Sequence, residues 1–347
     1  MLPEAAPEPL LDVRDLRVAF RTEEGLVRAV DGVSLSVAPG EVVGIVGESG
    51  SGKTVSMLAL MRLIRDPNAL IEGEVLHRGR DLLRVSQNEI RSVRGGEIAM
   101  IFQDPMTSLT PVYTVGWQIA EQLRAHERMS RKQARARTVE LLAEVGISNP
   151  ERRADDFPHQ FSGGMRQRVM IAMALSCNPS LLIADEPTTA LDVTIQAQIL
   201  ELMKRLQRDH GSSILLITHD MGVVAGLAER VIVMYAGRIV EEGPRAAVFR
   251  DPQHPYTWGL LGSIPRVDRP RVPRLAAIPG APPSPLDLRE GCPFEPRCLH
   301  RFDHCATRPE LRERVAAGRK DACHLDPVVR PALRQMSMRG EVERASA

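Results

Sequence analysis

The sequence predicts an α/β fold with a mostly parallel core sheet, a helical insert and a small, irregular, cysteine-rich C-terminal domain. Three observations predict it. Short aliphatic runs at residues 42–46, 181–184, 214–217 and 231–234 are typical of strands buried on both faces. Helical patterns separate these runs, as in α/β domains. A glycine-rich loop follows the first run, and four of the five cysteines lie beyond residue 290.

The first expected element is a strand at residues 11–18, where apolar and polar side chains alternate. The residues before it, 1–9, are acidic and proline-rich and are predicted to be disordered. They lack the basic start and apolar stretch of a signal peptide. The main domain is expected to begin after this segment and to span residues 10–250.

Length and charge narrow the class of protein. The chain has 347 residues, and its 45 Lys and Arg residues nearly balance 44 Asp and Glu residues. Nucleic-acid binders usually carry a basic excess, so this balance disfavours such a partner. No apolar run approaches the roughly 18 residues that span a bilayer. The sequence predicts a cytosolic protein, peripheral if it serves a membrane.

Helical patterns give the remaining elements of the main domain. Residues 194–210 have an apolar face, and Gly211 is expected to end that helix. The insert spans about 104–165 and contains two predicted helices, 115–126 and 131–145. Ser130 and Gln133 fit a capping box at the start of the second helix, and Gly146 fits its end.

The loop GESGSGKT fits the phosphate-binding pattern G-x-x-x-x-G-K-[ST] at every fixed position. A glycine-rich turn could match by chance, but a strand precedes this one and a predicted helix, 55–64, follows it. Lys53 is expected to contact the β- and γ-phosphates of ATP, and Thr54 to ligate Mg²⁺. The loop residues expected to bind nucleotide are Gly47, Glu48, Ser49, Gly50, Ser51, Gly52, Lys53 and Thr54.

Two adjacent acids, Asp185 and Glu186, end the aliphatic run at 181–184. Strand ends in α/β sheets are where ligands bind, so the pair is a candidate catalytic site. Asp185 is expected to hold Mg²⁺, and Glu186 to orient or deprotonate the attacking water. The alternative is an acidic strand-to-loop turn without chemistry.

The segment FSGGM, residues 161–165, lies after the insert and twenty residues before the carboxylate strand. Together with the phosphate loop, Gln103 and His219, it resembles the nucleotide-binding subunits of ABC transporters. The resemblance implies a P-loop ABC-type ATPase domain with an N-terminal antiparallel β subdomain. Phe161 and Met165 depart from the usual leucine and glutamine, but the Ser-Gly-Gly core is intact.

The resemblance also implies roles for single residues. Ser162, Gly163 and Gly164 would cap the γ-phosphate of ATP held by a second subunit. Gln103 would contact Mg²⁺ and water, and His219 would contact the γ-phosphate. Asp192 resembles a residue of the loop that crosses the dimer, and it also fits a helix N-cap. Phe20 is the candidate for stacking on adenine, with a place in the core as its alternative.

Cys292, Cys298, Cys305 and Cys323 could bind zinc or an iron–sulfur cluster, or no metal. Three histidines are alternative ligands. They are His300, His304 and His324. The fifth cysteine, Cys177, is expected to be a small buried hydrophobe. Cys292, Cys298, Cys305 and Cys323 lie in a predicted extension, 251–327. The residues after it, 328–347, are polar and are predicted to be a disordered tail.

Residues 103–111, the HPYTW motif at 254–258 and the cysteine-rich extension resemble the oligopeptide/dipeptide importer ATPases. That family implies a [4Fe–4S] cluster on the four clustered cysteines. It also implies a related second ATPase subunit, two transmembrane permease subunits and an extracytoplasmic solute-binding protein, at the cytoplasmic face of the membrane. The alternatives are an importer of another solute, such as nickel or a sugar, and an ABC ATPase of the DNA-repair or chromosome type. The second is disfavoured because the insert is too short for a long coiled coil.

Overall fold

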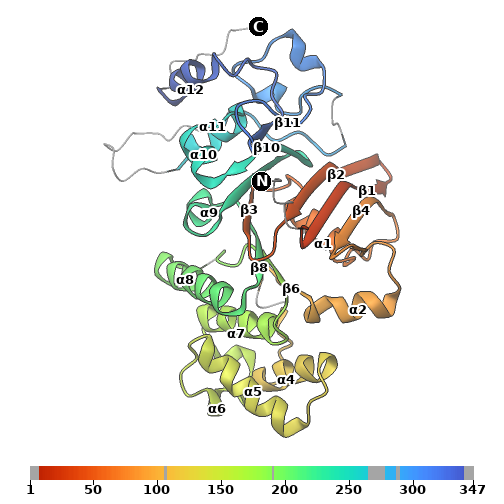
Figure 1. Cartoon of the computed structure of the whole chain (residues 1–347), viewed down its shortest axis with the longest axis vertical. Helices are drawn as coiled ribbons and strands as arrows, with labels where there is room; N and C mark the ends of the chain where they lie inside the picture. The colour runs from red at the N-terminus through yellow and green to blue at the C-terminus, as the bar shows by residue number, and fades with distance from the viewer. Residues whose placement is uncertain (1–7, 105–107, 190, 265–277, 287–289, 340–347) are drawn as a thin grey trace, which may run out of the picture. The chain divides into compact units, whose positions relative to one another are not determined.

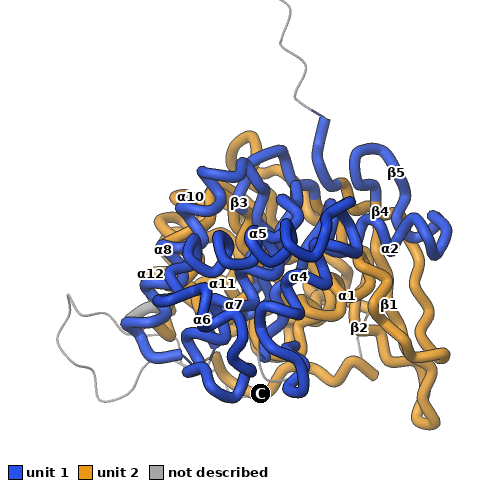
Figure 2. The backbone as a smooth tube through the Cα atoms, turned by 90° about the horizontal axis from the view of Figure 1, so that it is seen from below, with its two compact units in different colours: residues 1–11, 36–42, 76–217 blue, residues 12–35, 43–75, 218–347 orange. Residues whose placement is uncertain are grey.

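The computed structural model describes residues 8–104, 108–189, 191–264, 278–286 and 290–339. The chain divides into two compact units. The first contains residues 1–11, 36–42 and 76–217, and the second contains 12–35, 43–75 and 218–347. Figure 2 colours them separately, and each is described by itself.

Three parallel strands form the centre of the first unit. They are β6 (Ile98–Ile101), β7 (Leu181–Asp185) and β8 (Ser213–Thr218), with Leu181 opposite Ser213 and Ile98 opposite Leu181. Every residue of β7 and β8 is buried. Full burial explains why these strands are continuous aliphatic runs rather than alternating ones. The predicted strands at 181–184 and 214–217 are confirmed.

The helical insert belongs to the same unit. Its helices are α4 (Val115–His126), α5 (Arg131–Glu144) and α6 (Pro150–Arg153), and helix α7 (Gly163–Leu175) follows them; Figure 1 shows the four helices grouped. Ser130 and Gln133 form the predicted capping box at the start of α5. Each cap satisfies backbone N–H groups that the first helical turn leaves unpaired.

Two further helices of this unit are α2 (Gln87–Gly96) and α8 (Val193–His210). Helix α8 buries Ile199, Leu202, Met203 and Leu206 and ends at Gly211, whose φ is 66°. This positive φ suits glycine, so the predicted end of the helix is confirmed. Helix α2 was not predicted, because its sequence is mostly polar and buries only Ile90 and Val93.

The second unit has a mixed sheet. Strand β3 (Val42–Val46) pairs in parallel with β9 (Arg230–Tyr235), which pairs antiparallel with β10 (Arg238–Pro244). The short strands β12 (Lys320–Asp321) and β11 (Arg312–Glu313) continue this sheet beyond β10. Its helices are α1 (Lys53–Leu60), α9 (Met221–Leu227), α10 (Arg245–Arg250) and α11 (Pro255–Gly262). The predicted strands at 42–46 and 231–234 are therefore confirmed.

A second sheet contains β2 (Gly25–Val37), β1 (Leu11–Thr22) and β4 (Ala69–His77), in that order, and β5 (Arg80–Asp81) pairs with the end of β4. Strands β4 and β5 are antiparallel. Only two residues join β1 to β2, and so short a connection permits only antiparallel pairing. The N-terminal antiparallel subdomain is therefore present, and the predicted strand at 11–18 is longer than expected.

The C-terminal extension differs from its prediction. Its described residues have only short elements, as the proline content predicts. These are helix α11, the two 3₁₀ turns Glu295–Arg297 and Asp303–Ala306, and the strands β11 and β12. However, β12 pairs with β10, and the extension belongs to the same compact unit as the phosphate loop. A separate cysteine-rich domain is not seen.

The tail from residue 328 was predicted to be disordered, yet residues 330–339 form α12. The polar composition predicts exposed, disordered residues, but Arg330 is almost completely buried, at 1% exposed. Its guanidinium pairs with Asp321 at 3.0 Å and donates to the Leu325 carbonyl at 2.6 Å. The predicted disorder of residues 340–347, and of 1–7 at the other end, lies outside the described residues.

Replacing Arg330 with alanine is expected to lower the free energy of unfolding by about 3–5 kcal/mol. The reason is that Asp321, itself 2% exposed, would be left as a buried charge without its nearest cation. Urea unfolding of the full chain measures the change. Arg312→Ala is the matched control, because its pair with Glu310 is exposed on both sides. Equal effects of the two variants would contradict the prediction.

Candidate functional site

The phosphate loop connects β3 to α1 in the second unit, as predicted. Its glycines are needed where other backbone approaches closely. A Cβ atom on Gly47 would lie 2.2 Å from the Met234 carbonyl oxygen, and one on Gly52 would lie 2.4 Å from that of Ala29. Gly52 also has a φ of 94°, which L-residues rarely adopt. The loop is therefore held against its neighbours in one backbone shape.

Lys53, the first residue of α1, lies over the loop that precedes it. It is 5% exposed, and its Nζ donates to the Gly47 carbonyl at 2.7 Å and the Glu48 carbonyl at 2.9 Å. A further contact joins Nζ to Ser51 Oγ at 3.3 Å. Ser49, Gly50 and Thr54 are exposed. The loop thus combines a fixed ammonium with open backbone and a hydroxyl, an arrangement suited to phosphate and Mg²⁺.

The carboxylate pair lies in the first unit. Asp185 is the last residue of β7 and is 2% exposed. Glu186 follows with a φ of 47°, in a left-handed conformation uncommon for glutamate. Its Oε2 accepts hydrogen bonds from Gln103 Nε2 at 3.0 Å and Thr189 Oγ1 at 2.8 Å. The structure therefore brings together Glu186 and Gln103, both singled out from the sequence.

Thr189 was not singled out from the sequence. Its hydroxyl shares Glu186 Oε2 with Gln103, so two donors hold the carboxylate in one orientation. The only signal was its place three residues after Glu186, in the same turn. Ala190, two residues before Asp192 in the predicted crossing loop, lies outside the described residues, as do residues 105–107 of the stretch 103–111.

The Ser-Gly-Gly segment begins α7. Ser162 is the N-cap, and its Oγ accepts a hydrogen bond from the Met165 amide. Ser162 and Gly163 are exposed, whereas a Cβ atom on Gly164 would lie 2.8 Å from Ile195 Cγ2. Gly164 thus allows α7 to approach α8 closely, and the exposed N-terminal end of α7 favours an anion.

Three other candidates have simple local settings. Asp192 is the N-cap of α8, with Oδ1 accepting from the Thr194 and Ile195 amides at 3.1 and 3.0 Å. His219 is exposed and lies between the end of β8 and the start of α9. Phe20 is half-buried in β1. The N-cap prediction for Asp192 is confirmed, and Phe20 is not a fully buried core residue.

The four clustered cysteines are free thiols in the described structure. Three of them are buried and Cys298 is half-buried. Burial raises the pKa of Cys292 to about 11 and the pKa of both Cys298 and Cys323 to about 12. A backbone hydrogen bond joins the Cys292 amide to the Cys305 carbonyl at 2.9 Å.

Among the described residues, no three or more His, Cys, Asp or Glu side chains are arranged to hold a metal ion. The predicted ligand set is therefore not assembled. The histidines have other partners, with His300 bonded to Ser337 Oγ and His324 to the Thr307 carbonyl. Cys177, expected to be buried, is half-buried in the structure.

The chain is similar in sequence to known ABC transporter proteins. The family model "ABC transporter" matches residues 30–189, and "Oligopeptide/dipeptide transporter, C-terminal region" matches residues 240–305. The chain is 51% identical over 326 residues to the dipeptide transport ATP-binding protein DppD of Escherichia coli (strain K12), covering 93% of this chain and 99% of DppD. It is 57% identical over 286 residues to the oligopeptide transport ATP-binding protein OppD of Bacillus subtilis (strain 168), covering 82% and 80%.

Solved structures agree with these matches. The dimeric structure of MJ0796, a bacterial ABC transporter cassette, aligns with a TM-score of 0.61 at 30% identity, over 68% of this chain and 98% of that one. CbiO1 from Clostridium perfringens, part of the ABC transporter complex CbiONQ, aligns with a TM-score of 0.60 at 27% identity, over 70% and 91%.

Proposed function

Because the chain belongs to the oligopeptide/dipeptide importer family of ABC transporter ATP-binding proteins, we propose that its phosphate loop and carboxylate pair hydrolyse ATP to drive peptide import. The observation that carries this proposal is the loop geometry, with Lys53 held over three loop acceptors beside exposed backbone. The chain is an ABC transporter ATPase, and 51% identity over nearly all of DppD supports a dipeptide or oligopeptide as the solute.

The proposed division of labour assigns phosphate contact to Lys53 and the loop amides. Thr54 and Asp185 would hold Mg²⁺, whose preferred ligands are oxygen atoms. The ion neutralises phosphate charge when bound. Glu186 orients or deprotonates water, and Gln103 and Thr189 fix the direction of its carboxylate.

The remaining site residues are proposed to act in a dimer. Ser162, Gly163 and Gly164 would meet the γ-phosphate of ATP bound to the second subunit, while His219 contacts the γ-phosphate within its own subunit. The exposure of Ser162 and Gly163 supports this role, since a segment that reaches a partner must be accessible. Asp192 would lie at the dimer crossing and Phe20 would stack on adenine, for which its half-buried ring is available.

The partners follow from the family. We expect a related second ATPase subunit, two transmembrane permease subunits and, through them, an extracytoplasmic solute-binding protein. The described residues include no helix that is both long and apolar enough to cross a bilayer. From the family, a peripheral place at the cytoplasmic face, held by the permease subunits, is proposed. No nucleic-acid partner is proposed for this nearly neutral chain.

Uptake of a labelled dipeptide tests this function. Cells lacking the chain should lose uptake and should regain it with the wild-type chain but not with a Lys53→Ala chain. Labelled nickel and a labelled sugar serve as competing solutes in parallel assays. Loss of nickel or sugar uptake, with dipeptide uptake unchanged, would overturn the peptide assignment and favour the alternative solute.

A [4Fe–4S] cluster on Cys292, Cys298, Cys305 and Cys323 is a finer proposal. It is supported by the match of residues 240–305 to the C-terminal region of the peptide transporters and by the burial of three of the thiols. The side chains as described are not gathered into a ligand set. No step of ATP hydrolysis is therefore assigned to a cluster.

Anaerobically purified protein is expected to contain about four irons and four acid-labile sulfides per chain. Replacing Cys298 with serine should remove the associated absorption. Cys177→Ser is the matched control, because this cysteine lies in a different compact unit. Zinc in place of iron, or folded protein that binds ATP without any metal, would overturn the cluster proposal while leaving the ATPase assignment intact.

A further inference from the structure

Residues of the C-terminal extension make direct contact with the phosphate loop within the second unit. The Arg297 guanidinium donates two hydrogen bonds to the carboxylate of Glu48, at 2.6 Å to Oε2 and 3.0 Å to Oε1. The Arg297 side chain is only 5% exposed and the Glu48 side chain is 29% exposed, so the pair is partly shielded from water. A bidentate arginine–carboxylate pair fixes the orientation of the carboxylate as well as its distance from the guanidinium.

A second contact fixes the backbone of the same loop residue. The Glu48 amide donates to the Tyr256 hydroxyl at 2.8 Å, and Tyr256 is fully buried in α11. Burial raises the pKa of Tyr256, so the hydroxyl stays neutral. The ring packs against Tyr235, with centroids 4.6 Å apart, and against Phe294, 5.4 Å away. Both the side chain and the amide of Glu48 are therefore held by residues outside the loop.

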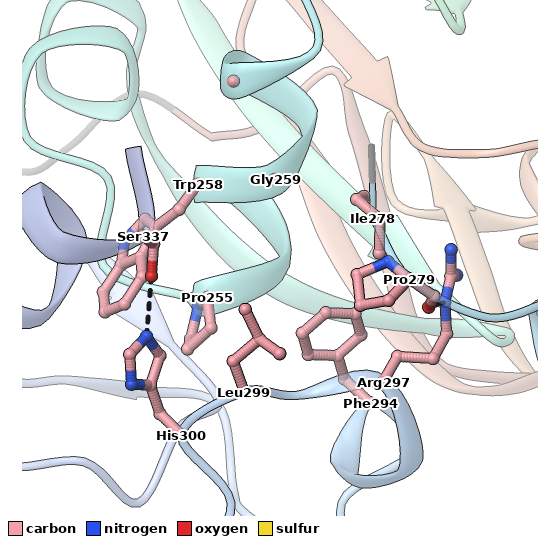
Figure 3. Close-up of a pocket in the computed structure, with 11 residues that line it drawn as sticks. Pro255, Trp258, Gly259, Ile278, Pro279, Phe294, Arg297, Leu299, His300 and Ser337 are labelled. Carbon is pink, nitrogen blue, oxygen red and sulfur yellow. Dashed lines mark hydrogen bonds between the residues drawn. The ribbon is translucent and has the colours of Figure 1, made fainter. Parts of the chain in front are cut away.

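Arg297 is itself held in place from several sides. Its Nε donates to the Pro279 carbonyl at 2.9 Å, and its Nη1 contacts the Tyr235 hydroxyl at 3.3 Å. Figure 3 shows the Arg297 side chain beside Pro279 and Phe294, in the wall of a small pocket. The guanidinium is thus directed toward Glu48 by contacts with Pro279 and Tyr235, which lie outside the phosphate loop.

These contacts bear on Lys53, because the Glu48 carbonyl accepts a hydrogen bond from its ammonium at 2.9 Å. A shift of Glu48 would move that acceptor and, with it, the cation expected to meet the phosphates. A binding group that is displaced by even a small distance loses much of its favourable interaction with the bound molecule. The chain of contacts therefore runs from Arg297 and Tyr256 to Glu48 and then to Lys53.

We propose that Arg297 and Tyr256 are positioning residues of the nucleotide site, which makes the C-terminal extension part of the machinery that binds the ATP triphosphate. The inference rests on the proposed function of the phosphate loop. It adds that the loop depends on residues more than 200 positions away for its shape.

Binding of a fluorescent ATP analogue to the full-length chain tests the proposal. Arg297→Gln is expected to weaken binding about tenfold, a coupling typical of linked sites. Arg297→Lys should restore part of the affinity, and Tyr256→Phe should also weaken binding because the Glu48 amide loses its acceptor. Adding Glu48→Gln to Arg297→Gln should cost little more, because both changes break the same contact.

Arg334→Gln is the matched control. It removes an arginine of helix α12, whose Nη1 contacts Asp251 Oδ1 at 2.7 Å without touching the loop. Thermal unfolding without nucleotide shows whether each variant is folded. If Arg297→Gln is not folded, Tyr256→Phe is used to test the proposal in its place. Affinity equal to that of Arg334→Gln in the folded variants would overturn this proposal. A wild-type chain that binds no Mg·ATP would instead overturn the proposed function.

Discussion

Replacing Glu186 with glutamine is expected to lower the ATP turnover of the assembled transporter about 10²- to 10⁴-fold, the range of general base catalysis. The amide has nearly the same shape as the carboxylate and can still accept from Gln103 and Thr189 through its oxygen. It cannot take a proton from water. The turnover number should therefore fall while nucleotide affinity stays close to that of the wild type. Steady-state hydrolysis and equilibrium binding of ATP, measured on the same preparation, separate the two quantities.

The matched control for this change is Glu201→Gln on α8, where the glutamate side chain is 68% exposed and pairs loosely with Lys204. It removes the same charge from the same unit without touching the carboxylate pair. Turnover of the control should equal that of the wild type. Wild-type turnover in the Glu186→Gln transporter would exclude Glu186 as the residue that activates water.

Replacing Lys53 with alanine is expected to reduce ATP hydrolysis about 10²- to 10³-fold per active site, through lost stabilisation of phosphate charge. Unlike the glutamate change, it should also weaken nucleotide binding. The ammonium is nearly buried and is aligned by the Gly47 and Glu48 carbonyls, so alanine would leave the loop without this fixed cation. Binding and turnover should fall together.

Lys204→Ala is the control for this second variant, because Lys204 is on the surface of α8 with 40% of its side chain exposed. Unchanged folding of both lysine variants, checked by thermal unfolding, keeps the comparison valid. Retention of wild-type ATP affinity in the Lys53→Ala chain would contradict the role of the phosphate loop.

The sequence predicts best the features that depend on neighbouring residues. The buried strands β7 and β8 are continuous aliphatic runs, and the start of α5 is a two-residue capping signal at Ser130 and Gln133. The strand–loop–helix context of the phosphate loop is local as well. In each case the physical cause lies within a few residues of its effect.

Features that depend on distant residues could not be predicted. Glu48 and Arg297 are separated by 249 positions, and nothing near either residue signals their contact. Helix α12 has a polar composition that predicts disorder, yet it begins at an arginine buried against Asp321. Strands β11 and β12 have two residues each, too few for any alternation to be visible.

Those two short strands protect the edge of a sheet. Lys320 and Asp321 pair with Glu242 and Glu241 of β10, so they cover part of a strand that would otherwise be the last in its row. A strand with unpaired N–H and C=O groups is a template for strands of other molecules. A chain shortened before residue 320 would therefore expose the edge of β10 and is expected to self-associate. Every residue of the phosphate loop, the carboxylate pair and the Ser-Gly-Gly segment would remain in such a chain.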